Sequence, residues 1–318
     1  MRRVGAVDCG TNSIRLLVAD LHDRDDGTSG LHEITRQLQV VRLGEGLDAT
    51  GRISAGAMGR TLAAAEGYAA LCRDAGCESV RFVATSASRD AENATEFVDG
   101  VREAFGDLRV VPEVVSGQEE AALSFAGATG DLRTRGVEGP YLVVDVGGGS
   151  TELVRGTTTV EAARSVDVGC VRMTERHLHD DDPPTEDQVW AALSDIVRAV
   201  QDAAQDVELE GVATLVGLAG SVTTVTAHAL DLPGYQHDRI HGAELPVEKV
   251  VDACTDLLLM SRERRRALPY MHEGRVDVIG AGALVWRTVV QRVAHDAGLA
   301  TVRASETDIL DGIALSQA

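Results

Sequence analysis

One nine-residue pattern occurs twice in this chain, and this repeat restricts the folds open to it. The pattern Asp-x-Gly-x-x-Ser-x-x-Leu begins at Asp8 and again at Asp145, an offset of 137 residues (145 minus 8). In both copies, runs rich in apolar and β-branched residues flank a glycine turn, which predicts a β-hairpin. Two hairpins in the same register indicate two related halves, as expected after an internal duplication.

The hairpin turns carry the groups that bind phosphate in other proteins. Each follows an Asp at the end of a strand, and its backbone N–H and hydroxyl groups can enclose phosphate oxygens. Two such turns predict a phosphate-binding cleft, with Thr151 also open to interpretation as an ordinary strand residue. The predicted phosphate-binding residues of the two turns are Gly10, Thr11, Asn12, Ser13, Gly147, Gly148, Gly149, Ser150 and Thr151.

Helices and strands are predicted to alternate between and after the hairpins, which indicates an α/β fold. The segment 22–30 reads as a polar loop. A third glycine turn, ending in Gly220 and Ser221, follows an apolar strand and opens a helix. The predicted strands are 3–8, 13–20, 79–84, 108–115, 141–145, 150–155, one near 160 and 213–217; the predicted helices are 55–76, 90–106, 116–128, 172–179, 186–206, 246–260 and 275–291.

Composition narrows the range of functions. A length of 318 residues suggests about two domains of roughly 150 residues each. The formal net charge of -20 opposes diffuse binding to nucleic acid or to anionic membranes. Lys249 is the single lysine, so phosphate contacts must come from arginine, backbone N–H groups or a metal ion, and a lysine-dependent P-loop is excluded.

Cysteine usage and hydropathy bear on the compartment. The five cysteines form no CxxC pair and are dispersed, as is typical of a reducing compartment. Asp8 interrupts the first apolar run too early for a signal peptide, and no apolar stretch approaches the roughly 18 residues of a membrane span. These features predict a cytoplasmic protein without a membrane or nucleic-acid partner.

Six motifs occur in an order that resembles one known family. The paired turns and the third turn resemble the actin, sugar kinase and heat-shock ATPase superfamily, with two duplicated ribonuclease H-like domains and an interdomain cleft. Within it, the chain resembles the exopolyphosphatase and guanosine pentaphosphate phosphatase (Ppx/GppA) family, in its short two-domain form. The expected domains are 1–121 with about 300–318, and 122–299. The motifs are DCGTNSIRLLV, ATSASRDAEN, SGQEEA, VDVGGGSTELV, GCVRMTE and VDVIGAGAL.

The resemblance also implies roles for individual residues. Glu120 in SGQEEA is expected to be the general base that activates water, with the adjacent Glu119 as the alternative. Asp145 and Glu152, together with Asp8, are expected to hold Mg²⁺, with Mn²⁺ as the alternative cofactor. Asp8 is also open to a capping role in its turn. Arg89 is expected to contact substrate phosphate, and Gly220 and Ser221 to border the phosphate channel.

The function implied is an exopolyphosphatase that removes terminal orthophosphate from inorganic polyphosphate, with a preference for short chains and direct attack by water. The first alternative is a guanosine pentaphosphate phosphohydrolase of the stringent response, which would use the same turns and the same Glu120. A kinase or a non-catalytic nucleotide-binding switch remains as an alternative of another class. The resemblance also predicts a homodimer.

Overall fold

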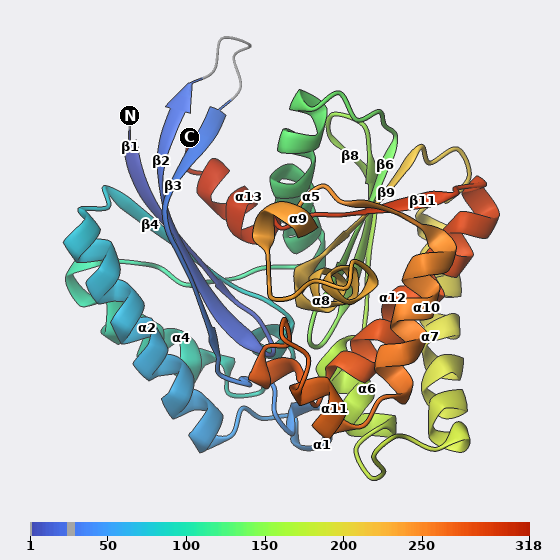
Figure 1. Cartoon of the computed structure of the whole chain (residues 1–318). Coiled ribbons are helices and arrows are strands. Elements are labelled where there is room, and N and C mark those ends of the chain that lie inside the picture. The colour runs from blue at the N-terminus through green and yellow to red at the C-terminus, as the bar shows by residue number, and fades with distance from the viewer. Residues whose placement is uncertain (1, 24–28) are drawn as a thin grey trace. The chain divides into compact units, whose positions relative to one another are not determined.

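The computed structural model describes residues 2–23 and 29–318, which form two compact units (Figure 1). Unit 1 comprises 1–127 and 309–318, and unit 2 comprises 128–308. Each unit contains one mixed β-sheet with helices packed against it. The α/β class predicted from the alternation of helices and strands is therefore confirmed.

The sheet of unit 1 has five strands in the order β3-β2-β1-β4-β5. The strand β2 pairs antiparallel with both β3 and β1, whereas β4 runs parallel to both β1 and β5. Its strands are β1 (Arg2–Cys9), β2 (Ser13–Asp23), β3 (Ser29–Val40), β4 (Ser79–Ala84) and β5 (Glu113–Val114).

Both faces of the sheet in unit 1 are buried, because alternate side chains of its central strands pack into two different hydrophobic clusters. Val7 and Leu16 pack into one hydrophobic cluster with the helices α2 and α4, while Ala6 and Leu17 pack into another that contains Leu310 of α13. Successive side chains of a strand point to opposite faces, so apolar residues at consecutive positions serve both clusters. The helices are α1 (Leu47–Thr50), α2 (Ala55–Ala75), α3 (Ser86–Asp90), α4 (Ala94–Phe105), the 3₁₀ turn η1 (Gly106–Leu108), the first part of α5 (Gly117–Thr134) and α13 (Ile309–Leu315).

Three expectations for unit 1 are wrong in detail. The ends of the predicted loop 22–30 belong to β2 and β3, while 24–28 lie outside the described residues. The predicted strand 108–115 contains only the two residues of β5, because η1 and a left-handed Arg109 precede it. The predicted helix 90–106 begins later, as α4 at Ala94, because α3 ends at Asp90 and Ala91 takes an extended conformation.

The six-stranded sheet of unit 2 repeats this arrangement. Its order is β10-β11-β9-β6-β7-β8, and reading from β8 to β11 gives the same parallel and antiparallel pairings as β3 to β5 in unit 1. The duplication predicted from the hairpins therefore extends over five strands, with β10 added at one edge. The strands are β6 (Tyr141–Val146), β7 (Thr151–Gly156), β8 (Val160–Val166), β9 (Thr214–Leu218), β10 (Glu244–Pro246) and β11 (Thr301–Ala304).

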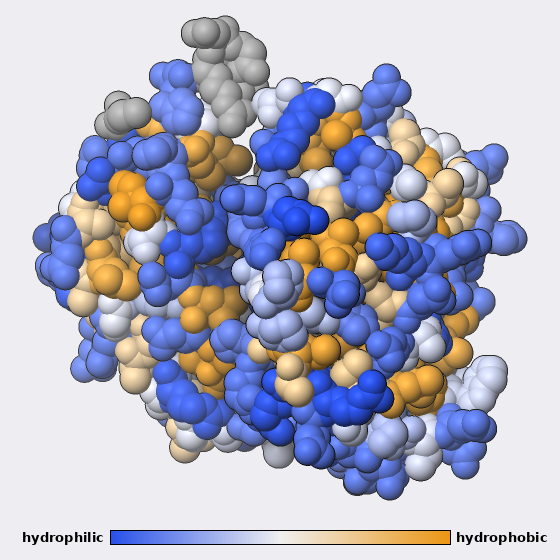
Figure 2. All heavy atoms as spheres, in the orientation of Figure 1, coloured by the Kyte–Doolittle hydropathy of each residue, from blue (hydrophilic) through white to orange (hydrophobic). Residues whose placement is uncertain are grey.

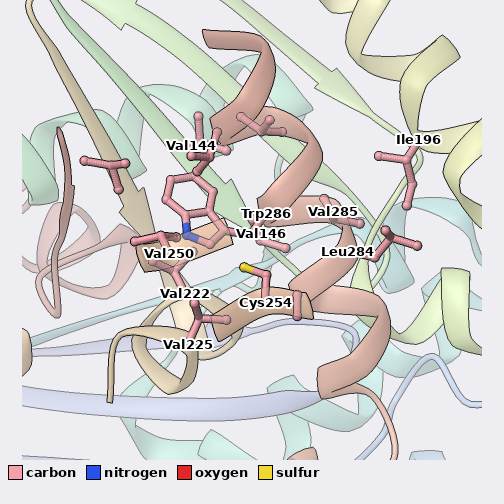
Figure 3. Close-up of a cluster of buried hydrophobic side chains, with 14 of the residues drawn as sticks. Val144, Val146, Ile196, Val222, Val225, Val250, Cys254, Leu284, Val285 and Trp286 are labelled. Atoms are coloured by element: carbon pink, nitrogen blue, oxygen red, sulfur yellow. The ribbon is translucent and has the colours of Figure 1, made fainter. Parts of the chain in front are cut away.

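Helices cover this sheet around an aliphatic core. Figure 3 shows Trp286 of α12 among Val144 and Val146 of β6, Val222 of α8 and Val250 of α10, and all of these residues are buried. Ordinary burial of such side chains contributes about 1.5–3 kcal/mol each. The helices are α6 (Cys170–His177), α7 (Glu186–Asp206), α8 (Ala219–Ala229), α9 (His237–Ile240), α10 (Val247–Leu259), α11 (Arg262–Arg266), the 3₁₀ turn η2 (Glu273–Arg275) and α12 (Ile279–Ala297).

The face of the molecule visible in Figure 2 is mostly hydrophilic, with smaller hydrophobic areas between. Within the described residues, no helix has the length and apolar character needed to cross a membrane.

Candidate active site

The two glycine turns have the same geometry. The N–H of Gly10 donates to the carbonyl of Ser13 at 3.0 Å, and the N–H of Gly147 donates to the carbonyl of Ser150 at 3.0 Å. Each bond closes the tip of a hairpin, between β1 and β2 in unit 1 and between β6 and β7 in unit 2. The nine-residue repeat therefore encodes one local structure twice.

The turn of unit 2 is braced by the start of α6. Gly147 and Gly148 carbonyls accept the N–H groups of Cys170 and Val171 at 2.9 and 2.8 Å. A Cβ at Gly169 would lie 2.4 Å from the carbonyl oxygen of Gly148, so only glycine permits this approach. Within the described part of the chain, the N–H groups of Gly148 and Gly149 take no acceptor, so they are available to an anion.

Two carboxylates lie opposite each other on the hairpin of unit 2. Asp145 of β6 pairs in register with Glu152 of β7, and both side chains are buried. Such directly opposed residues have Cβ atoms about 4.5–5.5 Å apart and share a face of the sheet. Glu152 Oε1 accepts hydrogen bonds from the hydroxyl groups of Ser150 and Ser165, both at 2.7 Å, which hold it in place.

The equivalent place in unit 1 has a different charge. Asp8 pairs in register with Arg15, and Asp8 Oδ2 accepts from Arg15 Nη2 at 2.6 Å and from Nε at 2.9 Å. Arg15 thus stands where the second hairpin has Glu152. A guanidinium in direct contact compensates the Asp8 carboxylate, which weakens the case for Asp8 as a metal ligand.

The helix α5 directs its two neighbouring glutamates to different partners. Glu120 has a buried side chain, 10% exposed, and its Oε2 accepts from Arg89 Nη1 at 3.0 Å. Glu119 is 47% exposed and pairs instead with Arg81, at 2.9 Å. Successive helical residues point about 100° apart, which separates the two carboxylates. Arg89 Nη1 also donates to the carbonyl of Val115 at 3.0 Å, which fixes the guanidinium beside Glu120.

The third turn brings in an arginine that sequence reasoning did not assign to the site. Gly220 and Ser221 begin α8, as predicted. A Cβ at Gly220 would lie 2.6 Å from the guanidinium carbon of Arg275, and Arg275 Nη1 donates to Thr224 Oγ1 at 3.2 Å. Arg275 ends η2 and was expected to begin a helix, which starts at Ile279 instead. The sequence carries no periodic signal for this contact.

Two of the predicted phosphate-binding residues differ in their hydrogen bonding. Thr151 has a partner within the protein, whereas one atom of Asn12 has none among the described residues. Thr151 is fully buried and its hydroxyl donates to the carbonyl of Val168, which supports its alternative reading as a strand residue. Asn12 Oδ1 is buried and has no hydrogen-bond partner among the described residues. Because a buried polar atom without a partner is costly, this side chain is the more readily explained if it lies against a ligand.

The described residues contain no group of three or more His, Cys, Asp or Glu side chains arranged to hold a metal ion. Asp145 and Glu152 form a pair of carboxylates instead. Mg²⁺ keeps several water ligands and is commonly bound by one or two carboxylates together with substrate phosphates. A buried, opposed pair beside a phosphate-type turn therefore fits Mg²⁺ without a third protein ligand.

The chain consists of two duplicated α/β units, each with a glycine turn at the tip of a β-hairpin. A model of the Ppx/GppA phosphatase family matches residues 21–317. The chain therefore belongs to the Ppx/GppA phosphatase family.

Several known proteins are similar to this chain over nearly its whole length. Exopolyphosphatase 2 of Mycobacterium tuberculosis is 45% identical, and the match covers 100% of this chain and 99% of that protein. The crystal structure of an exopolyphosphatase-like protein is 42% identical, with a TM-score of 0.93 over 99% of this chain and 98% of the other. The Ppx/GppA family member of Aquifex aeolicus is 27% identical, with a TM-score of 0.79 over 99% and 97%.

Proposed function

We propose that this chain is an exopolyphosphatase, which hydrolyses the terminal phosphoanhydride bond of inorganic polyphosphate and releases orthophosphate. The observation that carries the proposal is the 45% identity, over the full length of both chains, to a protein named an exopolyphosphatase. Hydrolysis of a phosphoanhydride needs an activated water, charge neutralisation and alignment of the reacting atoms. The turns and ion pairs described above supply candidates for each.

Glu120 is the proposed general base. It would accept the proton of a water molecule as the water oxygen attacks the terminal phosphorus. Arg89 supports this role, because its Nη1 lies 3.0 Å from Glu120 Oε2. A phosphate bound to the remaining donors of this guanidinium would be held next to the base. Glu119 is the weaker candidate, because its carboxylate pairs with Arg81 and not with Arg89.

Asp145 and Glu152 are the proposed holders of Mg²⁺. Mg²⁺ bound there would neutralise negative charge on the phosphate oxygens. Ser150 and Ser165 would keep the Glu152 carboxylate oriented through their 2.7 Å hydrogen bonds. Loss of a residue that orients a metal ligand in this way typically lowers metal affinity by about 10–100-fold.

Phosphate oxygens would be bound by backbone and guanidinium donors. The N–H groups of Gly148 and Gly149 support binding in unit 2, and Arg275 adds a guanidinium at the turn of Gly220. Arginine is suited to phosphate because its planar donors can form two parallel hydrogen bonds. Arg275 therefore joins the residues proposed for substrate binding.

The decisive experiment measures orthophosphate release by the wild type, Glu120→Gln and Glu119→Gln, with Mg²⁺ present or chelated. Substrates are short polyphosphate, long polyphosphate and guanosine pentaphosphate. We expect Mg²⁺-dependent release from polyphosphate, faster from short chains. We expect Glu120→Gln to lower kcat by about 10²–10⁴-fold, as loss of a general base does. Glu119→Gln is the matched control and should remain close to the wild type.

Each alternative predicts a different result in this assay. Release of orthophosphate from guanosine pentaphosphate but not from polyphosphate would identify the chain as a guanosine pentaphosphate phosphohydrolase and contradict the proposal. Loss of activity in Glu119→Gln, with Glu120→Gln active, would transfer the base to Glu119. Binding of polyphosphate without hydrolysis in all three proteins would indicate a binding protein.

A further inference from the structure

Two cysteines meet at the C-terminal end of α2 in unit 1. The helix ends in a left-handed Gly76, whose N–H donates to the carbonyl of Arg73 at 2.9 Å, while the N–H of Cys77 donates to the carbonyl of Cys72 at 3.0 Å. These two bonds define a Schellman motif. In that motif the side chains at the positions of Cys72 and Cys77 characteristically pack together.

The two cysteines occupy the paired side-chain positions of the Schellman motif but differ in exposure. Cys72 is fully buried, and its Sγ lies under β1, 3.0 Å from where a Cβ on Gly5 would stand. Cys77 is partly exposed. The Cys77 thiol is therefore accessible to a reagent, whereas the Cys72 thiol is shielded from solvent.

Neighbouring groups lower the pKa of the Cys77 thiol below its ordinary value. The hydrogen bond from Cys72 lowers the pKa of Cys77 most, and the nearby Arg3 guanidinium lowers it further, against the effects of burial and of Asp20. Arg3 is held on this helix end, because its Nη1 donates to the carbonyl of Ala75 at 2.9 Å and its Nε to Asp20 at 2.9 Å. Glu78, the next residue, accepts the N–H of Arg3 through Oε1 at 3.3 Å. The same hydrogen bond raises the pKa of Cys72.

We propose that Cys72 and Cys77 form a thiol pair that a hydroperoxide oxidises reversibly to an intramolecular disulfide. The Cys77 thiolate attacks one peroxide oxygen, the O–O bond breaks, and a sulfenic acid and one water form. Cys72 then loses its proton and attacks the Cys77 sulfur, which forms the S–S bond and releases a second water. Two thiols and one H₂O₂ thus give one disulfide and two waters, and a dithiol restores the reduced pair.

The other cysteines provide internal controls. Cys9, Cys170 and Cys254 are buried, and burial raises the pKa of each thiol. Thiols of this kind react slowly with peroxides and with alkylating reagents. Oxidation is therefore expected at Cys77 first, with Cys72 as its partner.

Peptide mapping tests the proposal directly. The reduced full-length protein is treated with H₂O₂, free thiols are alkylated under denaturing conditions, and the chain is cut by trypsin. Because Arg73 lies between the two cysteines, their disulfide would join two peptides, 61–73 and 74–81. We expect this linked species, its loss after dithiothreitol, and unoxidised peptides for Cys9 and Cys254.

Two variants extend the test. Cys77→Ser should abolish the linked species and leave Cys72 reduced, while Cys72→Ala should leave Cys77 as a sulfenic acid. In Cys72→Ala, the midpoint of the pH profile for alkylation of Cys77 should shift upward, because the S–H donor is gone. Unlinked peptides in the wild type, disulfides between two chains, or an unshifted midpoint in Cys72→Ala would overturn the proposal.

Discussion

At the scale of single residues, the two hairpins differ most in the charge opposite the strand-terminal aspartate. Asp8 lies opposite Arg15, whereas Asp145 lies opposite Glu152. Two opposed carboxylates repel each other in a buried place unless a cation or a proton lies between them. The duplicated fold therefore places a carboxylate opposite a carboxylate in unit 2 and a carboxylate opposite a guanidinium in unit 1.

This difference predicts separate effects on the metal requirement. Glu152→Gln should raise the Mg²⁺ concentration needed for half-maximal activity by about tenfold or more, because a charged oxygen ligand is lost. Asp8→Asn should leave that concentration unchanged and instead lower the free energy of unfolding, because the ion pair between Asp8 and Arg15 is lost. Titration of phosphate release with Mg²⁺, together with urea unfolding, measures both. A shifted Mg²⁺ requirement in Asp8→Asn would restore Asp8 as a ligand.

Some residues of the candidate site can be predicted from the sequence and others cannot. Asp145 and the glycine turns stand out because a repeat in register is improbable by chance. The role of Arg15 cannot be predicted from the sequence, because its side-chain direction depends on strand pairing. Arg275 could not be found, because its contact with Gly220 joins segments 55 residues apart in sequence (275 minus 220), without any shared pattern.

At the scale of elements, a helix crossing in unit 1 depends on one small residue. A Cβ on Gly312 of α13 would lie 2.0 Å from the carbonyl oxygen of Leu123 in α5, so the two helices touch through the glycine. Gly312→Ala should lower the free energy of unfolding by about 1–3 kcal/mol, as overpacking of a core does. Gly67→Ala in α2 is the matched control, because nothing lies within 4 Å of its Cβ position.

The control variant should behave in the opposite way. Replacing an exposed helical glycine by alanine stabilises a helix by up to about 1 kcal/mol. Urea unfolding of both variants, followed by circular dichroism, gives the comparison. Equal stability of Gly312→Ala and the wild type would mean that α13 shifts freely on α5.

Long periodic elements were predictable and short or edge elements were not. The helix α7, predicted at 186–206, has those bounds, and its Thr185 and Gln188 form a capping box. The strand β3 was not predicted, because most of its side chains are at least partly exposed. Its neighbour β2, in contrast, contributes many buried residues to the core. An edge strand of polar residues gives little hydrophobic alternation, so its pairing is visible only in three dimensions.

At the scale of the whole molecule, the charge of -20 opposes the approach of an anionic polymer. The proposed phosphate contacts are arginines and backbone groups, which act over a few ångströms. Repulsion by the net charge acts over the Debye length, about 30 Å at 0.01 M salt and 10 Å at 0.1 M. Salt therefore weakens the long-range repulsion before it weakens contacts inside the site.

This balance predicts an unusual salt dependence of substrate capture. Between 0.01 and 0.1 M KCl, at constant free Mg²⁺, kcat/KM for polyphosphate should rise by up to about tenfold, because electrostatic effects on association reach that size. The free energy of unfolding should rise over the same range, since self-repulsion is screened. Sucrose at equal osmolarity is the control. A fall in kcat/KM with KCl would mean that the field of the arginines near the turns outweighs the net charge, and that the substrate is steered by that local field.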